Sequence, residues 1–355
     1  MDVSTSEEPT TNPRHAASGR RELRSDDPVL SWAGVVEMEH TPEWSRGWRL
    51  PLRRIGLFPG DDLRFRAGMQ AGVRVEFDTD ARIVGGRAVP VSDDAETQIV
   101  DLVVDGRLAG SVPVGASGDF SFGELPAGEK SVELWLPQFG DFRLAAVEVD
   151  AAARVWPASP SRRPRLLTYG SSITQCRTAA SPTRTWPAIV ARELDLDLTC
   201  LGFAGECHLD PMVGRMIRDL PADVLVACLG INVYGQGTFT KRSFLPAMLG
   251  LLSTIRDGHP GVPLIVMSPI VSPERENTAG ASGMSLAGMR AQVGEAVQLL
   301  REDGDKDIQL LDGLDVFGPG QAHMLGDGVH PNADGYAHMA GSITPVVRMA
   351  FAPAR

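Results

Sequence analysis

The sequence predicts two folded parts: an all-β region of the sandwich or jelly-roll type, followed by an α/β domain with a five-stranded parallel sheet. Short apolar runs separated by glycine and proline fill the first part, whereas strands and helices alternate from residue 165 onward. A stretch rich in proline and arginine separates the two. At 355 residues the chain is long enough to form two hydrophobic cores.

The first 27 residues are polar throughout, and we expect residues 1–27 to form a disordered tail. They contain no apolar segment of the kind that a secretory signal needs, and no run of about 18 apolar residues follows. We therefore expect a cytoplasmic protein that does not enter a membrane. The net charge of -11 argues against a nucleic-acid partner, which usually requires a basic surface.

Residues 28–155 are predicted to form the β domain. Asp105-Gly106 lies between two apolar runs and predicts a tight hairpin. The segment 131–136 largely alternates apolar and polar residues, which is typical of a half-buried strand. The predicted strands include Leu63–Arg66, Val73–Phe77, Gln98–Val104, Ser131–Leu136 and Leu144–Val149.

The connection between the two domains is predicted at residues 156–164. The surrounding stretch, AAARVWPASPSRRP at 151–164, contains three prolines and three arginines. Such a composition favours an extended and solvated backbone.

Residues 165–355 are predicted to form the α/β domain. Strands are expected at 165–169, 197–201, 224–229, 264–267 and 308–311. Helices are expected at 185–194, 212–220, 243–257, 286–300 and 336–347, where apolar residues recur every three or four positions. Strands that alternate with helices in this way predict a parallel, doubly wound sheet.

Four short motifs follow predicted strands or the long loop after the last strand. They are GSSIT at 170–174, GFAG at 202–205, GIN at 230–232 and DGVHP at 327–331. Because ligands bind at the carboxyl ends of the strands in such sheets, we expect all four motifs at one edge. Each motif alone is also compatible with an ordinary turn, a helix cap or a surface loop.

Together the motifs supply the groups that acyl transfer through a serine requires. Ser172 is the predicted nucleophile, His330 the predicted base and Asp327 the carboxylate that orients it. The backbone N–H groups of Ser172 and Gly205 and the amide of Asn232 are the predicted oxyanion donors.

Residues 165–350 resemble the SGNH, or GDSL-type, hydrolase family, whose four blocks are matched by Ser172, Gly205, Asn232 and His330. Asp327 stands in the family's Asp-x-x-His-Pro position. The resemblance implies a flavodoxin-like three-layer α/β/α fold, no cofactor, and acyl-serine chemistry on esters or thioesters. The β region resembles the jelly-roll modules of some members, including carbohydrate esterases.

The chain departs from the family pattern at three positions. Ser171 stands where the family often has Asp, Cys200 where Asn often begins the second block, and Val233 where Asp often follows the Asn. The four cysteines form no CxxC pair, which argues against a zinc site or a disulfide scaffold. A disulfide between Cys176 and Cys207 is compatible with the sequence.

The main hypothesis is an enzyme that transfers an acyl group from an ester or thioester of an intracellular small molecule. Water or an alcohol is the acceptor, so the enzyme is an esterase or an acyltransferase of natural-product tailoring. One alternative is a carbohydrate deacetylase with a sugar-binding β domain, and another is a catalytically dead binding protein. Both invoke stacking on Trp32, Trp44, Trp48 and Trp135. In a further reading, the β domain forms one wall of the active-site cleft.

Overall fold

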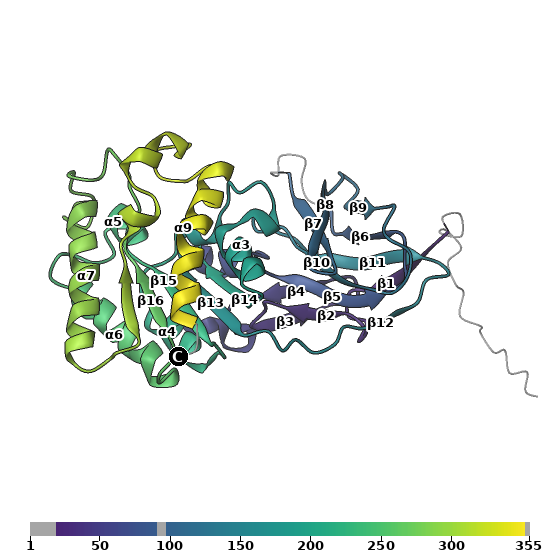
Figure 1. Ribbon diagram of the computed structural model, residues 1–355, viewed down its shortest axis with the longest axis horizontal. Helices are drawn as coiled ribbons and strands as arrows, with labels where there is room; N and C mark the ends of the chain where they lie inside the picture. The colour runs from purple at the N-terminus through teal and green to yellow at the C-terminus, as the bar shows by residue number, and fades with distance from the viewer. Residues whose placement is uncertain (1–18, 91–96, 352–355) are drawn as a thin grey trace, which may run out of the picture.

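The computed structural model describes residues 19–90 and 97–351. A β-rich part and an α/β part lie side by side along the long axis of the molecule (Figure 1). The first 18 residues of the expected disordered tail lie outside the described residues. In the part of the chain that the structure describes, no helix has the length and apolar character needed to cross a lipid bilayer.

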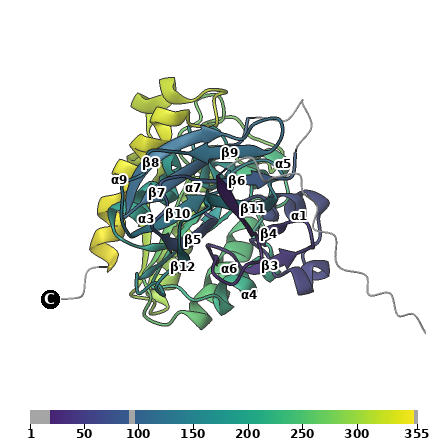
Figure 2. The same cartoon turned by 90° about the vertical axis from the view of Figure 1, so that its right-hand side faces the viewer.

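The β-rich part consists of two antiparallel sheets that enclose a common core, so the predicted all-β sandwich is confirmed (Figure 2). One sheet has the order β3-β4-β11-β6-β9 with β1 beside β11, and the other has the order β12-β5-β10-β7-β8 with β2 beside β5. Its strands are β1 Arg20–Arg24, β2 Ser31–Ala33, β3 Glu37–His40, β4 Ser45–Trp48, β5 Arg74–Thr79, β6 Val84–Ala88, β7 Ile99–Val104, β8 Arg107–Pro113, β9 Asp119–Phe122, β10 Lys130–Trp135, β11 Leu144–Asp150 and β12 Val155–Pro157.

The expected limits of this part need two corrections. Residues 20–24 form β1 and pair with β11, so the sheet begins within the expected tail. Residues 155–157 form β12 and pair with β5, so the sheet continues into the expected linker. Neither β1 nor β12 has a clear apolar pattern of its own. Both lie at the edge of a sheet, and each pairs with a strand that is distant in sequence.

The segment that includes the expected strand 63–66 is a helix, α1, Asp61–Ala67, which follows the short 3-10 helix η1, Leu52–Leu57. The alternation of Leu63-Arg-Phe-Arg66 predicted a strand wrongly. Gly60 has φ of 103°, which turns the chain into a helix that begins with two acidic residues. Leu63 and Ala67, one helical turn apart, are the residues buried.

The α/β part contains the predicted five-stranded parallel sheet, in the order β14-β13-β15-β16-β17. Its strands are β13 Arg165–Gly170, β14 Asp197–Gly202, β15 Val224–Cys228, β16 Leu264–Met267 and β17 Ile308–Leu311. Its helices are α2 Ser172–Gln175, η2 Pro182–Arg184, α3 Trp186–Glu193, α4 Pro211–Asp219, α5 Ile231–Gln236, α6 Phe244–Gly258, α7 Leu286–Glu302, α8 Gly313–Val316, η3 Pro319–Met324 and α9 Ala333–Phe351.

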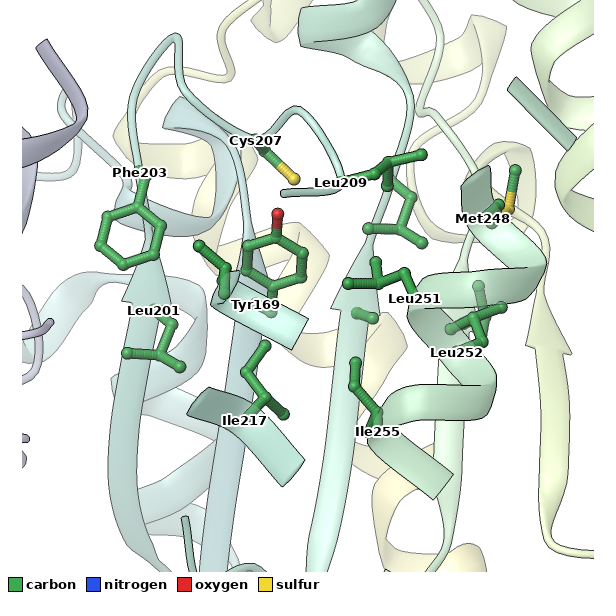
Figure 3. Packing of buried hydrophobic residues seen from close by; sticks show 14 of the residues in the cluster. Tyr169, Leu201, Phe203, Cys207, Leu209, Ile217, Met248, Leu251, Leu252 and Ile255 are labelled. Atoms are coloured by element: carbon green, nitrogen blue, oxygen red, sulfur yellow. The ribbon is translucent and has the colours of Figure 1, made fainter. Parts of the chain in front are cut away.

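Helices cover both faces of this sheet because successive residues of a strand point to opposite faces. Leu167 and Tyr169 of β13 pack in the core that includes α4, α6 and α7, whereas Leu166 packs in the core that includes α3 and α9. Figure 3 shows the first of these cores, with Tyr169 between the sheet and the side chains of α4 and α6. The three-layer α/β/α arrangement follows from this alternation.

Two arginines of the β domain cover the free edge of β14, which has a strand neighbour on one side only. Leu198, Cys200 and Gly202 turn their carbonyl groups outward, as every second residue of an edge strand does. Arg74 donates to the Leu198 carbonyl at 3.3 Å, and Arg49 donates to Cys200 at 3.2 Å and to Gly202. The β domain thus takes the place of a further strand.

Arg49 is fully buried and has no carboxylate partner among residues 19–90 and 97–351. Besides β14, its guanidinium donates to the carbonyls of Met69, at 2.8 Å, and Arg66, and it lies over the ring of Phe203 at 5.1 Å. Burial lowers the pKa of Arg49 to about 10, so the group stays charged at neutral pH. Backbone dipoles therefore neutralise a cation within the domain interface.

The interface contains further polar contacts and close approaches, beside apolar residues of the β domain that pack in the cores of the α/β part. Asp101 of β7 accepts hydrogen bonds from Ser181, at 2.7 Å, and from the backbone and hydroxyl of Thr183. Gly72 approaches β14 so closely that an added Cβ would lie 2.8 Å from the Cβ of Cys200. The two domains therefore fit together at fixed positions along the strand.

Replacing Arg49 with Met should destabilise the protein strongly. The substitution keeps most of the side-chain volume but leaves buried carbonyls of both domains without donors, and we expect a loss of about 3 kcal/mol. Urea unfolding followed by tryptophan fluorescence measures the change. Arg348→Met, at an exposed position of α9, is the matched control and should leave the midpoint unchanged. An Arg49→Met midpoint equal to the control's would contradict the role of this interaction.

Candidate active site

A pocket of about 810 Å³ opens at the carboxyl ends of β13, β14 and β15, between the two domains. This is the edge at which the four motifs were expected. The pocket is lined by Arg66, Phe139, Ser172, Arg177, Thr178, Ala204, Gly205, Ile231, Asn232, Tyr234, Gly235, Gln236, Arg275, Asp327, Val329 and His330.

Ser172 lies where β13 turns into the single-turn helix α2. Ser171 precedes this helix in an extended conformation, and its hydroxyl accepts the Ile173 N–H at 3.2 Å. Ser171 therefore caps the helix, a function that a carboxylate at this position would also serve. Ser172 is the first helical residue, so its N–H has no partner within the helix and can donate to a ligand.

Ser172, His330 and Asp327 form a continuous chain of hydrogen bonds. The Ser172 hydroxyl lies 2.8 Å from Nε2 of His330, and Nδ1 of His330 lies 2.7 Å from Oδ2 of Asp327. In the tautomer that suits this order, Nδ1–H donates to the carboxylate and Nε2 accepts from the serine.

Asp327 is held as an anion by its own loop. Its Oδ1 accepts the backbone N–H groups of Val329, at 3.0 Å, and His330, at 2.8 Å. Burial acts to raise the pKa of Asp327, but these bonds and the one from the imidazole outweigh it and lower the pKa to about 2. The carboxylate is therefore charged at neutral pH.

Neighbouring loops hold the 327–331 segment in place. Ser272, which follows β16, donates its hydroxyl to the Gly328 carbonyl at 2.6 Å and accepts from Arg275 at 3.1 Å. Thr178 donates to the Pro331 carbonyl at 2.7 Å. The 272–285 loop thus supports the base as well as bordering the pocket.

Gly205 and its neighbours form a braced turn after β14. Gly205 has φ of 82°, a conformation that favours glycine, and its carbonyl accepts from the Gln236 amide at 2.7 Å. The Ala204 N–H donates to Oε1 of the fully buried Gln175 at 2.9 Å. Because both neighbouring amide groups are fixed, the Gly205 N–H has a defined direction.

Asn232 lies in the first turn of α5 and borders the pocket. Its Oδ1 accepts the Cys207 N–H at 3.0 Å, which identifies the opposite end of the amide as the donor. Val233 is fully buried in the core beneath α5, so an apolar contact stands where the family often has Asp.

Sequence reasoning did not identify Gln175 and Ser272. Gln175 also donates to the Gln138 carbonyl of the β domain at 3.1 Å, so it connects the turn at Gly205 to the domain interface. Its position one residue after GSSIT is the only sequence signal that it offered. Ser272 offered none, because its partner Gly328 lies 56 residues away.

The remaining candidate residues lie away from the chemistry. All four cysteines are free and buried, and burial raises the pKa of Cys207 to about 12, so its thiol is unreactive. Among the histidines of residues 19–90 and 97–351, His330 alone borders the pocket. No group of three His, Cys, Asp or Glu side chains suited to a metal occurs in the same ranges.

The β domain contributes Arg66 and Phe139 to the pocket wall. Of the four tryptophans considered for sugar stacking, Trp48 and Trp135 are buried. Trp32 is half-buried against the sandwich core, and Trp44 is half-buried with the guanidinium groups of Arg46 and Arg143 at 5.5 and 4.9 Å from its ring. None of the four lines the pocket, to which this domain contributes Arg66 and Phe139.

Comparison with protein families agrees with this two-part organisation. Residues 163–348 match the GDSL-like lipase/acylhydrolase family, and residues 30–145 match the family described as the SsfX3 N-terminal domain. No curated protein matches the chain significantly.

Solved structures resemble most of the chain. A salicylyl-acyltransferase, SsfX3, from a tetracycline biosynthetic pathway is 33% identical, with a TM-score of 0.85 over 96% of this chain and 100% of that one. A putative GDSL-like lipase from Bacteroides ovatus is 18% identical, with a TM-score of 0.78 over 93% and 98% of the two chains. A family two carbohydrate esterase from Clostridium thermocellum is 17% identical, with a TM-score of 0.61 over 79% and 93%.

The last two similarities concern the fold alone, whereas the first extends to the sequence of both domains. The α/β domain accounts for the family match, and the β domain distinguishes the subgroup. The chain therefore belongs to the GDSL-like lipase/acylhydrolase family, as an SGNH-type serine esterase or acyltransferase with an SsfX3-type N-terminal domain.

Proposed function

We propose that the enzyme transfers an acyl group from an ester or thioester donor to a hydroxyl group of a small molecule through an acyl-Ser172 intermediate. The observation that carries this proposal is the unbroken Ser172–His330–Asp327 chain, with distances of 2.8 and 2.7 Å, within an 810 Å³ pocket. Serine acyl transfer requires this order of hydroxyl, imidazole and carboxylate.

In the first step, Oγ of Ser172 attacks the carbonyl carbon of the donor, and its proton passes to Nε2 of His330. Asp327 stabilises the imidazolium that forms. The negative charge that develops on the carbonyl oxygen is bound by the N–H groups of Ser172 and Gly205 and by the NH₂ group of Asn232. When the carbon–oxygen or carbon–sulfur bond of the donor breaks, His330 returns the proton to the leaving group.

In the second step, the acceptor hydroxyl gives its proton to His330 and attacks the acyl carbon. When the second tetrahedral intermediate collapses, the bond between the acyl carbon and Oγ of Ser172 breaks, His330 returns the proton to Oγ, and the new ester is released. Water in place of the acceptor would give hydrolysis by the same steps, so the outcome depends on which hydroxyl the pocket holds against the acyl group.

Two observations favour transfer to an organic acceptor. The relative with 33% identity over nearly the whole chain is a salicylyl-acyltransferase, and it shares the N-terminal domain as well as the catalytic one. The pocket, at about 810 Å³, lies in the size range that holds drug-sized ligands. The carbohydrate esterases are similar in fold alone, and the burial of Trp48 and Trp135 removes support for sugar stacking.

Replacing Ser172 with Ala should abolish turnover. Loss of the nucleophile costs at least about 10³-fold in kcat for enzymes of this mechanism. Steady-state hydrolysis of an activated ester and labelling by a fluorophosphonate probe measure the effect. Ser253→Ala, on an exposed face of α6, is the control and should keep both signals. Wild-type turnover or labelling in Ser172→Ala would exclude the proposed intermediate.

Product partition distinguishes transfer from hydrolysis. With an activated ester donor and a panel of small-molecule alcohols, an ester product should appear and free acid should fall as the acceptor concentration rises. Mass spectrometry quantifies both products in the same sample. Free acid as the sole product, over the whole panel and at every concentration, would identify water as the second substrate.

The acid limb of the pH–rate profile should not arise from Asp327. Its pKa of about 2 lies below the ordinary value of 3.8, so the carboxylate is charged above both values. The stability that it adds is fully present above 3.8 and is lost as the pH falls from there through about 2.

Asp327→Asn should lower kcat/KM about 10³–10⁴-fold and keep the acid limb, because Asp327 itself titrates below the measured pH range. The measurement is kcat/KM for an activated ester from about pH 5 to 9. Asp334→Asn, exposed in the first turn of α9, controls for the lost charge. A limb that disappears in Asp327→Asn alone would contradict this assignment.

A further inference from the structure

Helix α5 forms the wall of the pocket next to the predicted oxyanion donors. Asn232 and Gly235 both line the pocket, and they lie on one face of the helix because they are three residues apart. Gln236, the next residue, donates to the Gly205 carbonyl at 2.7 Å. Gly235 therefore borders the space beside the carbonyl group of an ester bound at Ser172.

The backbone and the packing at Gly235 do not require glycine. Gly230 and Gly237, at the two ends of α5, have φ of 123° and 66°, a region that favours glycine, whereas Gly235 lies within the helix and is not among the described residues with positive φ. A Cβ added at Gly235 would meet no atom of residues 19–90 and 97–351 within 4 Å, apart from its chain neighbours and the backbone of α5. Glycine in a helix interior lowers stability relative to alanine, and packing does not offset that loss here. What the glycine provides is open space at the pocket wall.

Contacts with the loop after β16 hold α5 in place, so this space has a fixed boundary. The hydroxyl of Tyr234, which is buried, donates to the Thr278 carbonyl of that loop at 3.2 Å. Gly237 approaches the same loop so closely that an added Cβ would lie 2.8 Å from the carbonyl oxygen of Ala281. A side chain introduced at position 235 would therefore extend into the pocket, because these contacts keep the helix from withdrawing.

The two faces of the sheet indicate which part of the substrate lies beside Gly235. Val233 and Tyr234 of α5 pack in the core that includes α4, α6 and α7. The helix that follows His330, α9, packs with α3 in the core on the other face. Ser172, at the end of β13, lies between these two elements, and its hydroxyl is 2.8 Å from Nε2 of His330. Because the leaving group must receive its proton from His330, it lies on the side of α9, and the acyl substituent points toward α5.

We propose that Gly235 determines which acyl groups the enzyme accepts, and that the space beside it holds an acyl group that is bulky next to its carbonyl carbon, such as a ring or a branched chain. The inference rests on the proposed acyl transfer at Ser172, and it specifies the acyl part of the donor. A pocket of about 810 Å³ has room for such a group. Ile231, one helical turn before Gly235, supplies an apolar contact at the same wall.

Esters that differ in one half of the molecule test the proposal. Para-nitrophenyl acetate and para-nitrophenyl benzoate share a leaving group and differ in the acyl group, whereas para-nitrophenyl acetate and 1-naphthyl acetate share the acyl group. Each kcat/KM of a variant is divided by the wild-type value for the same ester, so that differences in intrinsic reactivity cancel. In Gly235→Leu the ratio for the benzoate should fall below that for either acetate by about tenfold or more, the discrimination that a change of one methylene group in a pocket can produce. Gly235→Ala should give a smaller loss in the same order.

Gly250 provides the matched control. It lies on an exposed face of α6, where an added Cβ also enters open space. Gly235→Ala and Gly250→Ala should both raise the midpoint of thermal unfolding, followed by circular dichroism, because alanine favours the helix and restricts the unfolded chain. Gly250→Leu should keep the wild-type preference among the three esters.

The possible outcomes separate the two proposals. The assigned function of Gly235 would be overturned by a wild-type enzyme that accepts the acetates but not the benzoate. Wild-type preference in Gly235→Leu, equal losses for all three esters, or a loss that follows the naphthyl leaving group would overturn it as well. Gly235→Ala carries the same comparison if Gly235→Leu does not fold. Absence of turnover and of an acyl-Ser172 adduct with every ester in the wild type would instead overturn the acyl-transfer proposal itself.

Discussion

The outward carbonyl groups of β14 are the constraint on which the rest of the molecule depends. A parallel sheet whose last strand lacks a neighbour leaves acceptors that must be satisfied. Here the donors are side chains, Arg49 and Arg74, of a domain placed earlier in the chain. Because the outward carbonyl groups occur at every second residue, the bonds to the arginines fix the position of the β domain along β14. The position of the pocket wall follows, because Arg49 and Arg66 lie at the same end of that interface.

Hydrogen bonds connect the domain interface directly to the active site. Gln175 bonds to Gln138 of the β domain on one side and to the Ala204 N–H of the oxyanion turn on the other. The direction of the Gly205 amide therefore depends on how the domains dock. This chain has a buried apolar residue, Val233, where the family often has Asp after the Asn. The turn at Gly205 is held by Gln175, which bonds to the neighbouring domain.

Local patterns predicted the α/β domain well, because each buried strand there is a short apolar run and each helix has an apolar face. The expected strands at 264–267 and 308–311 have the observed limits, and each of the other three differs by one residue at its carboxyl end. The α1 helix was not predicted, because Leu63 and Phe65 alternate with polar residues as they would in a strand. Gly60 and the packing of Ala67 determine the helical conformation instead. The edge strands β1 and β12 escaped it because their stability comes from partners that are distant in sequence. In the pocket, the motifs pointed to Ser172, Gly205, Asn232, Asp327 and His330. Residues that act across long sequence distances, such as Ser272, Gln175 and Phe139, have no motif of their own.

Different residues of the β domain bind the edge strand and line the pocket, and this separation has a consequence for redesign. The buried seam of Arg49 and Arg74 lies on the edge strand, whereas Arg66 and Phe139 reach the pocket from the end of α1 and from a loop. Grafting these two short segments from a homologue would exchange residues of the pocket wall while keeping both arginines of the seam, as long as the backbone carbonyl of residue 66 still accepts from Arg49. A chimera that replaces the entire β domain must instead place a donor opposite each outward carbonyl group of β14. A carbonyl group left without a donor would lower the stability of the fold, whatever the specificity of the new domain.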